Sequence, residues 1–127
     1  MAIISVSLDD ESMATLVTIQ EAYSLAGRSE AVRLSIKAAG SKAKEIEELS
    51  GFVEGVLIMV RGDHADPWMS LIQARHEGSI KTQMHSHLLN RKCLEVMVMS
   101  AEADDIKSIL REIQSVAKAD YVKFVKS

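Results

Sequence analysis

An alternation of apolar and polar residues opens the chain and predicts a short strand. Over residues 2–8 one side of the alternation is apolar and consists of Ala2, Ile4, Val6 and Leu8. We expect a helix to follow, with Asp9 or Asp10 as its N-cap. A second helix should run from a cap at Ser29 to a stop at Gly40. A strand with two helices has no partner inside the chain, so this segment predicts a dimer whose strands pair antiparallel above four helices.

The rest of the chain predicts a separate domain. Residues 41–50 are charged helix formers, which indicates either a solvated linker or a helical extension, and we place the domain boundary near Ser50–Gly51. Beyond it we expect strands at 53–61, 81–88, 93–99 and 121–125, and helices that begin at Asp66–Pro67 and Asp104–Asp105. This βαββαβ order predicts an α+β chain, in which a ferredoxin-like, or ACT-like, domain over 51–127 follows a dimerising βαα domain over 1–50.

Composition and charge narrow the class of protein. The chain has 127 residues, of which 47% are hydrophobic and 26% charged, so it can bury a core. A single cysteine excludes an internal disulfide and favours a reducing, cytoplasmic setting. We expect neither a signal peptide nor a membrane span, because the N-terminus lacks a basic start and the longest apolar run, 56–60, is too short. The net charge of −3 does not by itself indicate nucleic-acid binding.

All four histidines and the cysteine fall between positions 64 and 93, and this crowding points to a metal. His85 and His87 are two apart on a predicted strand, so both imidazoles face one side. If the hairpin that follows pairs symmetrically about Asn90, Cys93 lies opposite His87, within cross-strand contact. Two imidazoles and a thiolate suit Ni(II) or Cu(II) in planar geometry or Zn(II) in tetrahedral geometry, and the spacing does not choose among them.

The strand that begins at Cys93 has two distinct faces. One face is apolar and consists of Leu94, Val96 and Val98. We expect this face to pack on the helices of its own domain. The thiol would then point away from those helices, and the ligands would meet either solvent or another subunit.

The two remaining histidines differ in their surroundings. His76 closes a predicted helix and could supply a fourth ligand, from the same chain or from a neighbour. The pattern alone favours that role for His76 no more than a structural one. His64 lies in a predicted loop beside Asp63 and Asp66, and we interpret it as a solvated side chain.

Two separate segments resemble the nickel-responsive repressors of the NikR family, which are ribbon-helix-helix regulators. Residues 3–10 are similar to the family's DNA-reading strand and first helix cap, and residues 27–33 are similar to the start of its second helix. Residues 85–95 match the family's pattern of His-x-His, five residues and Cys-Leu-Glu, which is strongly specific. The resemblance covers essentially the whole chain in domain order.

The resemblance implies how the metal site is completed and how the protein assembles. It implies a homotetramer, a dimer of dimers joined through the C-terminal domains. One Ni(II) per chain would lie at the junction and be shared between two chains. His85, His87 and Cys93 would come from one chain, and His76 would come from the other.

The resemblance also implies a transcriptional regulator, most simply a repressor, that binds double-stranded operator DNA. A two-stranded ribbon fits the major groove, and the start of the second helix offers N–H groups and positive charge to phosphate. The residues assigned to these contacts are Ile3, Ser5 and Ser7 in the ribbon and Arg28, Ser29 and Arg33 at the second helix. Residues 1–40 hold three basic and five acidic residues, so non-specific affinity should be weak, which favours a switch that needs metal.

Other functions are weaker interpretations. The main alternative is a ribbon-helix-helix regulator that responds to Cu(II), Co(II) or Zn(II), or to a small molecule at the interface of the C-terminal domains. An antitoxin would carry a disordered tail, and residues 51–127 are too regularly patterned for that. An enzyme is disfavoured, because the sequence has no nucleophile–base pair and protein ligands would fill the metal site. A second cation site near Glu30, which some family members use, is not expected because Leu34 is not acidic.

Overall fold

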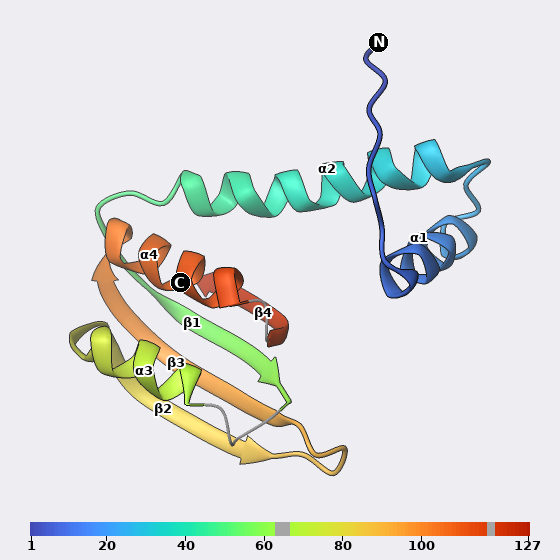
Figure 1. Ribbon diagram of the computed structural model, residues 1–127. Coiled ribbons are helices and arrows are strands. Elements are labelled where there is room, and N and C mark those ends of the chain that lie inside the picture. Colours follow the sequence, from blue (N-terminus) through green and yellow to red (C-terminus); the bar gives the residue numbers. More distant parts are fainter. Residues whose placement is uncertain (63–66, 117–118) are drawn as a thin grey trace. The chain divides into compact units, whose positions relative to one another are not determined.

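The computed structural model describes residues 1–62, 67–116 and 119–127 (Figure 1). The chain divides into two compact units, Met1–Ile46 and Glu47–Ser127. The elements in chain order are α1 (Asp10–Ala22), α2 (Arg28–Glu47), β1 (Phe52–Arg61), α3 (Trp68–Arg75), a 3-10 turn (Glu77–Ser79), β2 (Ile80–His87), β3 (Cys93–Glu102), α4 (Ala103–Val116) and β4 (Ala119–Lys126). In the described part of the chain, no helix is both long and apolar enough to cross a membrane.

The second unit is built on one antiparallel sheet of four strands in the order β2-β3-β1-β4. The long central strands β3 and β1 pair along their whole length, and β2 and β4 form the two edges. The helices α3 and α4 lie over one face of this sheet (Figure 1). The predicted α+β fold class and the ferredoxin-like, or ACT-like, C-terminal domain are therefore confirmed.

The helices cover the opposite face of the sheet from the one predicted. On β3 the buried residues are Cys93, Glu95, Met97 and Met99, whereas Val98 on the other face is 39% exposed. The amide nitrogen of Gln73 in α3 lies 3.9 Å from the sulfur of Met97, which places this face beneath the helices. The prediction that Leu94, Val96 and Val98 pack on the helices is therefore wrong. Methionine side chains fill an irregular core as readily as valines, and the one charged residue on this face of β3, Glu95, pairs with the buried Arg61.

The first unit confirms one predicted helix cap and contradicts another. The carboxylate of Asp9 accepts a hydrogen bond from the backbone N–H of Ser12 at 2.7 Å, so Asp9, one of the two residues predicted for this role, is the N-cap of α1. The second helix begins at Arg28, so Ser29 lies inside its first turn and is not the cap. A hydrogen bond from the N–H of Ala26 to the Glu30 carboxylate, 2.8 Å long, ties down the entry to α2 instead.

The predicted stop of the second helix at Gly40 is also wrong. The structure continues α2 through Gly40 to Glu47, so residues 41–47 form the helical extension that was one of two interpretations of this stretch. A glycine inside a helix costs only about 1 kcal/mol relative to alanine. The lysine, alanine and glutamate residues that follow are strong helix formers and offset that cost.

The start of α3 differs slightly from the prediction. Pro67 lies one position before the first helical residue, Trp68, and its backbone marks the helix start. The helix ends at Arg75, and His76 is its C-cap, as the sequence indicated. The predicted cap Asp66 and the histidine His64 lie outside the described residues.

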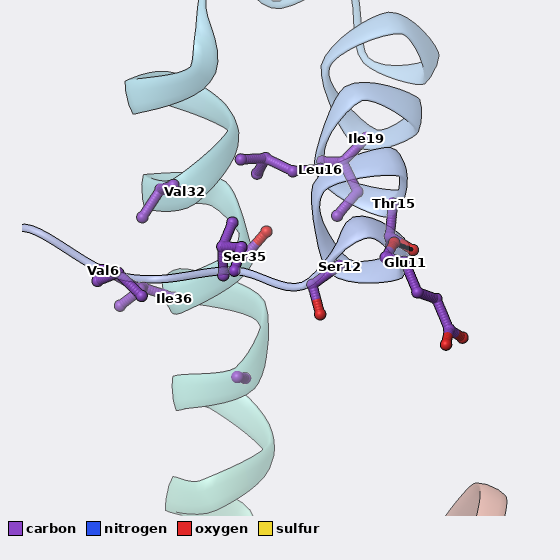
Figure 2. Close-up of a pocket in the computed structure, with 11 residues that line it drawn as sticks. Val6, Glu11, Ser12, Thr15, Leu16, Ile19, Val32, Ser35 and Ile36 are labelled. Carbon is purple, nitrogen blue, oxygen red and sulfur yellow. Dashed lines mark hydrogen bonds between the residues drawn. The ribbon is translucent and has the colours of Figure 1, made fainter.

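Residues 1–9 belong to neither a helix nor a strand of the single chain. A strand forms only when it pairs with another strand, and the predicted partner of residues 2–8 is the same segment of a second chain. The pairing of residues 2–8 therefore stays a prediction. In Figure 2 this segment crosses α2, with Val6 beside Ile36, and then leads into the start of α1. Val6 and Leu8 line an open apolar groove with Leu16, Ile19, Val32 and Ile36.

Candidate metal centre

The β2–β3 hairpin brings three of the four predicted ligands, His85, His87 and Cys93, together. The backbone N–H of Leu88 donates to the carbonyl of Lys92 at 2.7 Å, and the side-chain oxygen of Asn90 accepts from the N–H of Lys92 at 3.1 Å. This short turn starts the antiparallel ladder with the pair His87 and Cys93. The predicted opposition of these two residues about Asn90 is therefore confirmed.

His85, His87 and Cys93 form a compact group of potential metal donors. One nitrogen of each imidazole and the sulfur of the thiol all lie within 4.8 Å of one another. Bonds of about 2.0–2.3 Å put two ligands on opposite sides of one ion about 4.0–4.6 Å apart. The three donors are thus close to the spacing that one shared ion requires. Among the residues that the structure describes, this is the one such group of His, Cys, Asp or Glu side chains.

The surroundings of the group suit a borderline transition metal. Cys93 is fully buried on the central strand β3, while His85 and His87 are exposed on the edge strand β2. The two imidazole rings meet edge to face, with centroids 4.9 Å apart. Imidazole and thiolate donors select ions such as Ni(II), Cu(II) or Zn(II) over Mg²⁺ or Ca²⁺, which prefer oxygen. Because two of its members lie on an edge strand, the group is open to a further ligand from outside the domain.

Glu95 is a functional candidate that sequence analysis missed. It lies opposite His85 in the ladder, is 1% exposed, and has Oε1 2.6 Å from Nδ1 of His85. A carboxylate that accepts from one ring nitrogen leaves the lone pair of the imidazole on the other nitrogen, where a metal can bind. The signal was present in the sequence, because Glu95 shares the face of Cys93 by alternation and ends the Cys-Leu-Glu motif.

Arg61 accompanies Glu95 in the interior. Its Nη2 and Nε lie 3.0 and 3.3 Å from Oε1 of Glu95, and its guanidinium lies 5.9 Å from the ring centre of Trp68 in α3. The amide of Gln83 donates to the second carboxylate oxygen at 3.3 Å. A buried carboxylate is tolerated where it is paired and hydrogen-bonded, and both conditions hold for Glu95. No sequence pattern identified Arg61 as the partner of Glu95, because a polar residue at the end of a strand is common and usually exposed.

His76 lies apart from the donor group of its own chain. Its Nε2 is 3.3 Å from a carboxylate oxygen of Glu112 in α4, and both atoms are buried without a well-aligned hydrogen bond. Arg75 approaches the same oxygen at 3.5 Å. The structure therefore does not bring His76 to His85, His87 and Cys93 within one chain.

The residues assigned to DNA lie on exposed surface of the first unit. They are Ile3, Ser5 and Ser7 before α1, and Arg28, Ser29 and Arg33 in the first turns of α2. Val6 and Leu8 line the groove on the helices, as the alternation predicted for the apolar side of this segment. The Glu30 carboxylate is held by Ala26 and lies 4.0 Å from Arg33, so it already has polar partners.

Comparison with known proteins gives a consistent result. Residues 55–127 match the family described as the NikR C-terminal nickel-binding domain. A protein of Methanococcus maripaludis that is named a nickel-responsive regulator is 32% identical over 123 residues, which is 94% of this chain and 87% of that protein. Similarly named proteins of Methanococcoides burtonii and Haloarcula marismortui are 28% and 26% identical, over 94% and 91% of this chain and 88% and 85% of their own lengths.

Proposed function

Because the chain belongs to the family of nickel-responsive regulators, we propose that it is a transcription factor, most simply a repressor, whose binding to operator DNA is switched by Ni(II). The family consists of regulators and not of enzymes, and its C-terminal domain is a nickel-binding domain. The observation that carries the proposal is the group formed by His85, His87 and Cys93, whose donor atoms lie within 4.8 Å of one another.

In this proposal the three side chains would hold Ni(II), which would link two subunits when bound. The thiol of Cys93 must lose its proton to bind, so metal affinity falls at acid pH. The contact between Glu95 and Nδ1 of His85 supports coordination through Nε2 of that ring. The burial of Cys93 keeps one side of the site dry, which favours thiolate–metal bonding over hydration.

His76 is the proposed fourth ligand, donated by another subunit. The exposed edge position of His85 and His87 supports a donor that arrives from outside the domain. The Nε2 atom of His76 faces Glu112, so Nδ1 is the nitrogen that would reach the metal with its ring in this orientation. A ligand histidine commonly pairs its second nitrogen with a carboxylate, which is the role we assign to Glu112.

The open face of the sheet supports a homotetramer, a dimer of dimers joined through the C-terminal domains. This face is lined by the apolar side chains of Val56, Ile58 and Val60 on β1 and Leu94, Val96 and Val98 on β3. A large contiguous apolar patch at the centre of a sheet is typical of a surface that a partner covers. The open face is thus a second surface for a partner, on the other side of the sheet from Cys93 and Glu95. One Ni(II) per chain, shared between two chains, is part of the same proposal.

The proposed DNA-binding domain spans residues 1–50, which contain the first unit, Met1–Ile46. Two copies would pair residues 2–8 as a ribbon and cover the groove between α1 and α2, whose apolar lining includes Leu16 and Val32. The ribbon would present Ile3, Ser5 and Ser7 to the major groove, while Arg28, Ser29 and Arg33 contact phosphates. Metal binding would bias the arrangement of the two DNA-binding dimers, and DNA would in turn tighten metal binding.

A selection experiment tests the proposed function. Random double-stranded DNA is passed over the full-length protein with and without Ni(II), and the retained sequences are compared. We expect a palindromic sequence to be enriched only with nickel. Enrichment by Cu(II), Co(II) or Zn(II) at matched free-ion activity, without enrichment by nickel, would favour the alternative of another metal. Enrichment that no metal changes would favour a small-molecule effector at the C-terminal interface.

A further inference from the structure

We propose that Arg61 is a positioning residue of the metal site, which acts through Glu95 to fix the ring orientation and tautomer of His85 before metal binds. The inference rests on the proposed function only in taking His85 as a ligand. It concerns a residue that lies on a different strand from the three donors and contacts the site through a buried carboxylate.

The geometry converges on a single oxygen atom. Oε1 of Glu95 lies 3.0 Å from Nη2 of Arg61, 3.3 Å from its Nε and 2.6 Å from Nδ1 of His85. Two N–H donors of one rigid guanidinium converge on this oxygen, which fixes its direction as well as its distance. The oxygen that Arg61 holds is thus the oxygen that accepts from the imidazole.

Arg61 is itself held from two directions. It ends β1, where the ladder pairs it with Cys93, and its guanidinium lies over the ring of Trp68 at the start of α3. Its side chain is 8% exposed, so little water competes for these contacts. A lysine in this place would keep the charge but would lose the paired N–H donors that hold the carboxylate oxygen.

The pairing also determines what Glu95 can do. A carboxylate beside two imidazoles and a thiol can become a metal ligand itself. Here the guanidinium of Arg61 engages Oε1 and the amide of Gln83 lies 3.3 Å from Oε2. Both oxygens are therefore committed to protein donors, and Glu95 serves as an acceptor for His85 instead of as a ligand. The charges of Arg61 and Glu95 cancel, so the pair adds no net charge beside the metal.

The first consequence is measurable in the metal-free protein. With Oε1 held in place, neutral His85 should carry its proton on Nδ1, whereas a neutral solvent-exposed histidine prefers the proton on Nε2. Nitrogen NMR of the imidazoles, at a pH where the spectrum itself shows His85 to be neutral, reports the tautomer directly. We expect the Nδ1–H form to dominate in the wild type and to lose its dominance in Arg61→Met.

The second consequence is a loss of nickel affinity that depends on Glu95. Removing an outer partner of a ligand histidine commonly weakens metal binding about 10–100-fold. We expect Arg61→Met to weaken nickel binding by about tenfold or more, and Glu95→Gln to do the same. If Arg61 acts through Glu95, the double variant should bind nickel no more than about twofold more weakly than Glu95→Gln alone. Additive losses in the double variant would overturn the proposal.

Matched variants separate positioning from general stability. Arg111→Met removes an exposed arginine that lies 3.4 Å from Glu47, and it should leave the His85 tautomer and nickel affinity unchanged. If Arg61→Met lowers the melting temperature but keeps the wild-type tautomer and affinity, Arg61 is merely structural and the proposal is wrong. If Arg61→Met does not fold, Arg61→Lys replaces it. An unchanged tautomer and nickel affinity in Arg61→Lys would then overturn the proposal, and a shift in both would support it.

The two proposals can fail independently. If the wild-type protein gives no thiolate-to-nickel absorption band, the proposed function fails. The tautomer comparison between wild type and Arg61→Met in the metal-free protein still decides whether Arg61 positions His85.

Discussion

Cys93 lies directly opposite His87 in the β2–β3 ladder, at the pair next to the turn. This pairing places the thiol of Cys93 beside two imidazoles. It forms within one hairpin and does not depend on contacts with distant parts of the chain. A hairpin turn fixes its own register, so a shift of one residue would place Cys93 on the opposite face from both histidines. The metal group is therefore a local property of residues 85–93.

Replacing Cys93 with serine should remove the metal site but not the fold. A hydroxyl is a poor ligand for a borderline metal, so we expect nickel affinity to fall at least about 100-fold and the thiolate-to-nickel absorption band to disappear. The melting temperature of the metal-free protein should stay within a few degrees. Ser86→Ala is the matched control, because Ser86 lies between the two histidines but pairs with Leu94 on the other face. An intact absorption band in Cys93→Ser would contradict the assignment.

The hairpin and the element order could be predicted because they depend on local signals. Alternation marks β2 and β3, Asn90 suits the turn between them, and the apolar stripe of α4 is clear from its spacing. Even the pairing of Cys93 with His87 follows from counting outward from Asn90.

The covered face of the sheet could not be predicted from the same signals. On β3 both faces are largely apolar, one with valines and the other with methionines, so alternation separates the faces without saying which one lies beneath the helices. The buried charge of Glu95 made its face look exposed, and only the distant partner Arg61 reverses that conclusion. A pairing between residues 34 positions apart leaves no local pattern in the sequence.

Assembly should depend on the open face of the sheet. Val98 is 39% exposed at the centre of this face, so Val98→Glu should reduce the folding stability of a single domain only slightly. The same substitution would place an unpaired carboxylate in any interface that covers this face. We expect sedimentation to show species smaller than a tetramer. Gln114→Glu introduces the same charge on the exposed side of α4 and should leave the assembly unchanged. A tetramer that persists in Val98→Glu would exclude this face as the interface.

The N-cap formed by Asp9 should make the stability of α1 depend on pH. Hydrogen bonds from the backbone N–H of Ser12 and then from its side chain lower the pKa of Asp9 below 3.8. Because the folded pKa is depressed, the stabilisation is fully present above the unfolded value and is lost as pH falls through the folded one. The melting temperature of wild type relative to Asp9→Asn should therefore drop only below about pH 4. An Asp9 pKa at or above 3.8 by carboxyl NMR would contradict the cap.

Two glycines should respond to alanine in opposite ways. Gly40 lies in α2 with open space around its Cα, so Gly40→Ala should stabilise the protein by about 0.5–1 kcal/mol. At Gly55 an added Cβ would lie 2.5 Å from the carbonyl oxygen of Val125 and 2.6 Å from the ring of Phe124. Gly55→Ala should therefore destabilise by about 1–3 kcal/mol. Thermal unfolding of both variants checks this, and a destabilised Gly40→Ala would mean that α2 does not run through that position.

Substitutions in the predicted ribbon should weaken DNA binding without changing nickel binding. Ser5 and Ser7 are exposed and lie outside the apolar groove that Val6 lines. We expect Ser5→Ala combined with Ser7→Ala to weaken binding to the selected DNA about tenfold or more, at about 1–3 kcal/mol for each base contact, while nickel affinity stays unchanged. Loss of nickel binding with intact DNA binding would reject the ribbon assignment.

The most direct test of nickel-switched DNA binding is a titration of the selected DNA at fixed free nickel, for wild type and Cys93→Ser. We predict that DNA affinity of the wild type rises at least about 100-fold when Ni(II) saturates the site, as a coupling of about 3 kcal/mol requires. Cys93→Ser should show the low affinity at every nickel concentration. Equal DNA affinity with and without nickel in the wild type, or a full nickel response in Cys93→Ser, would contradict the account.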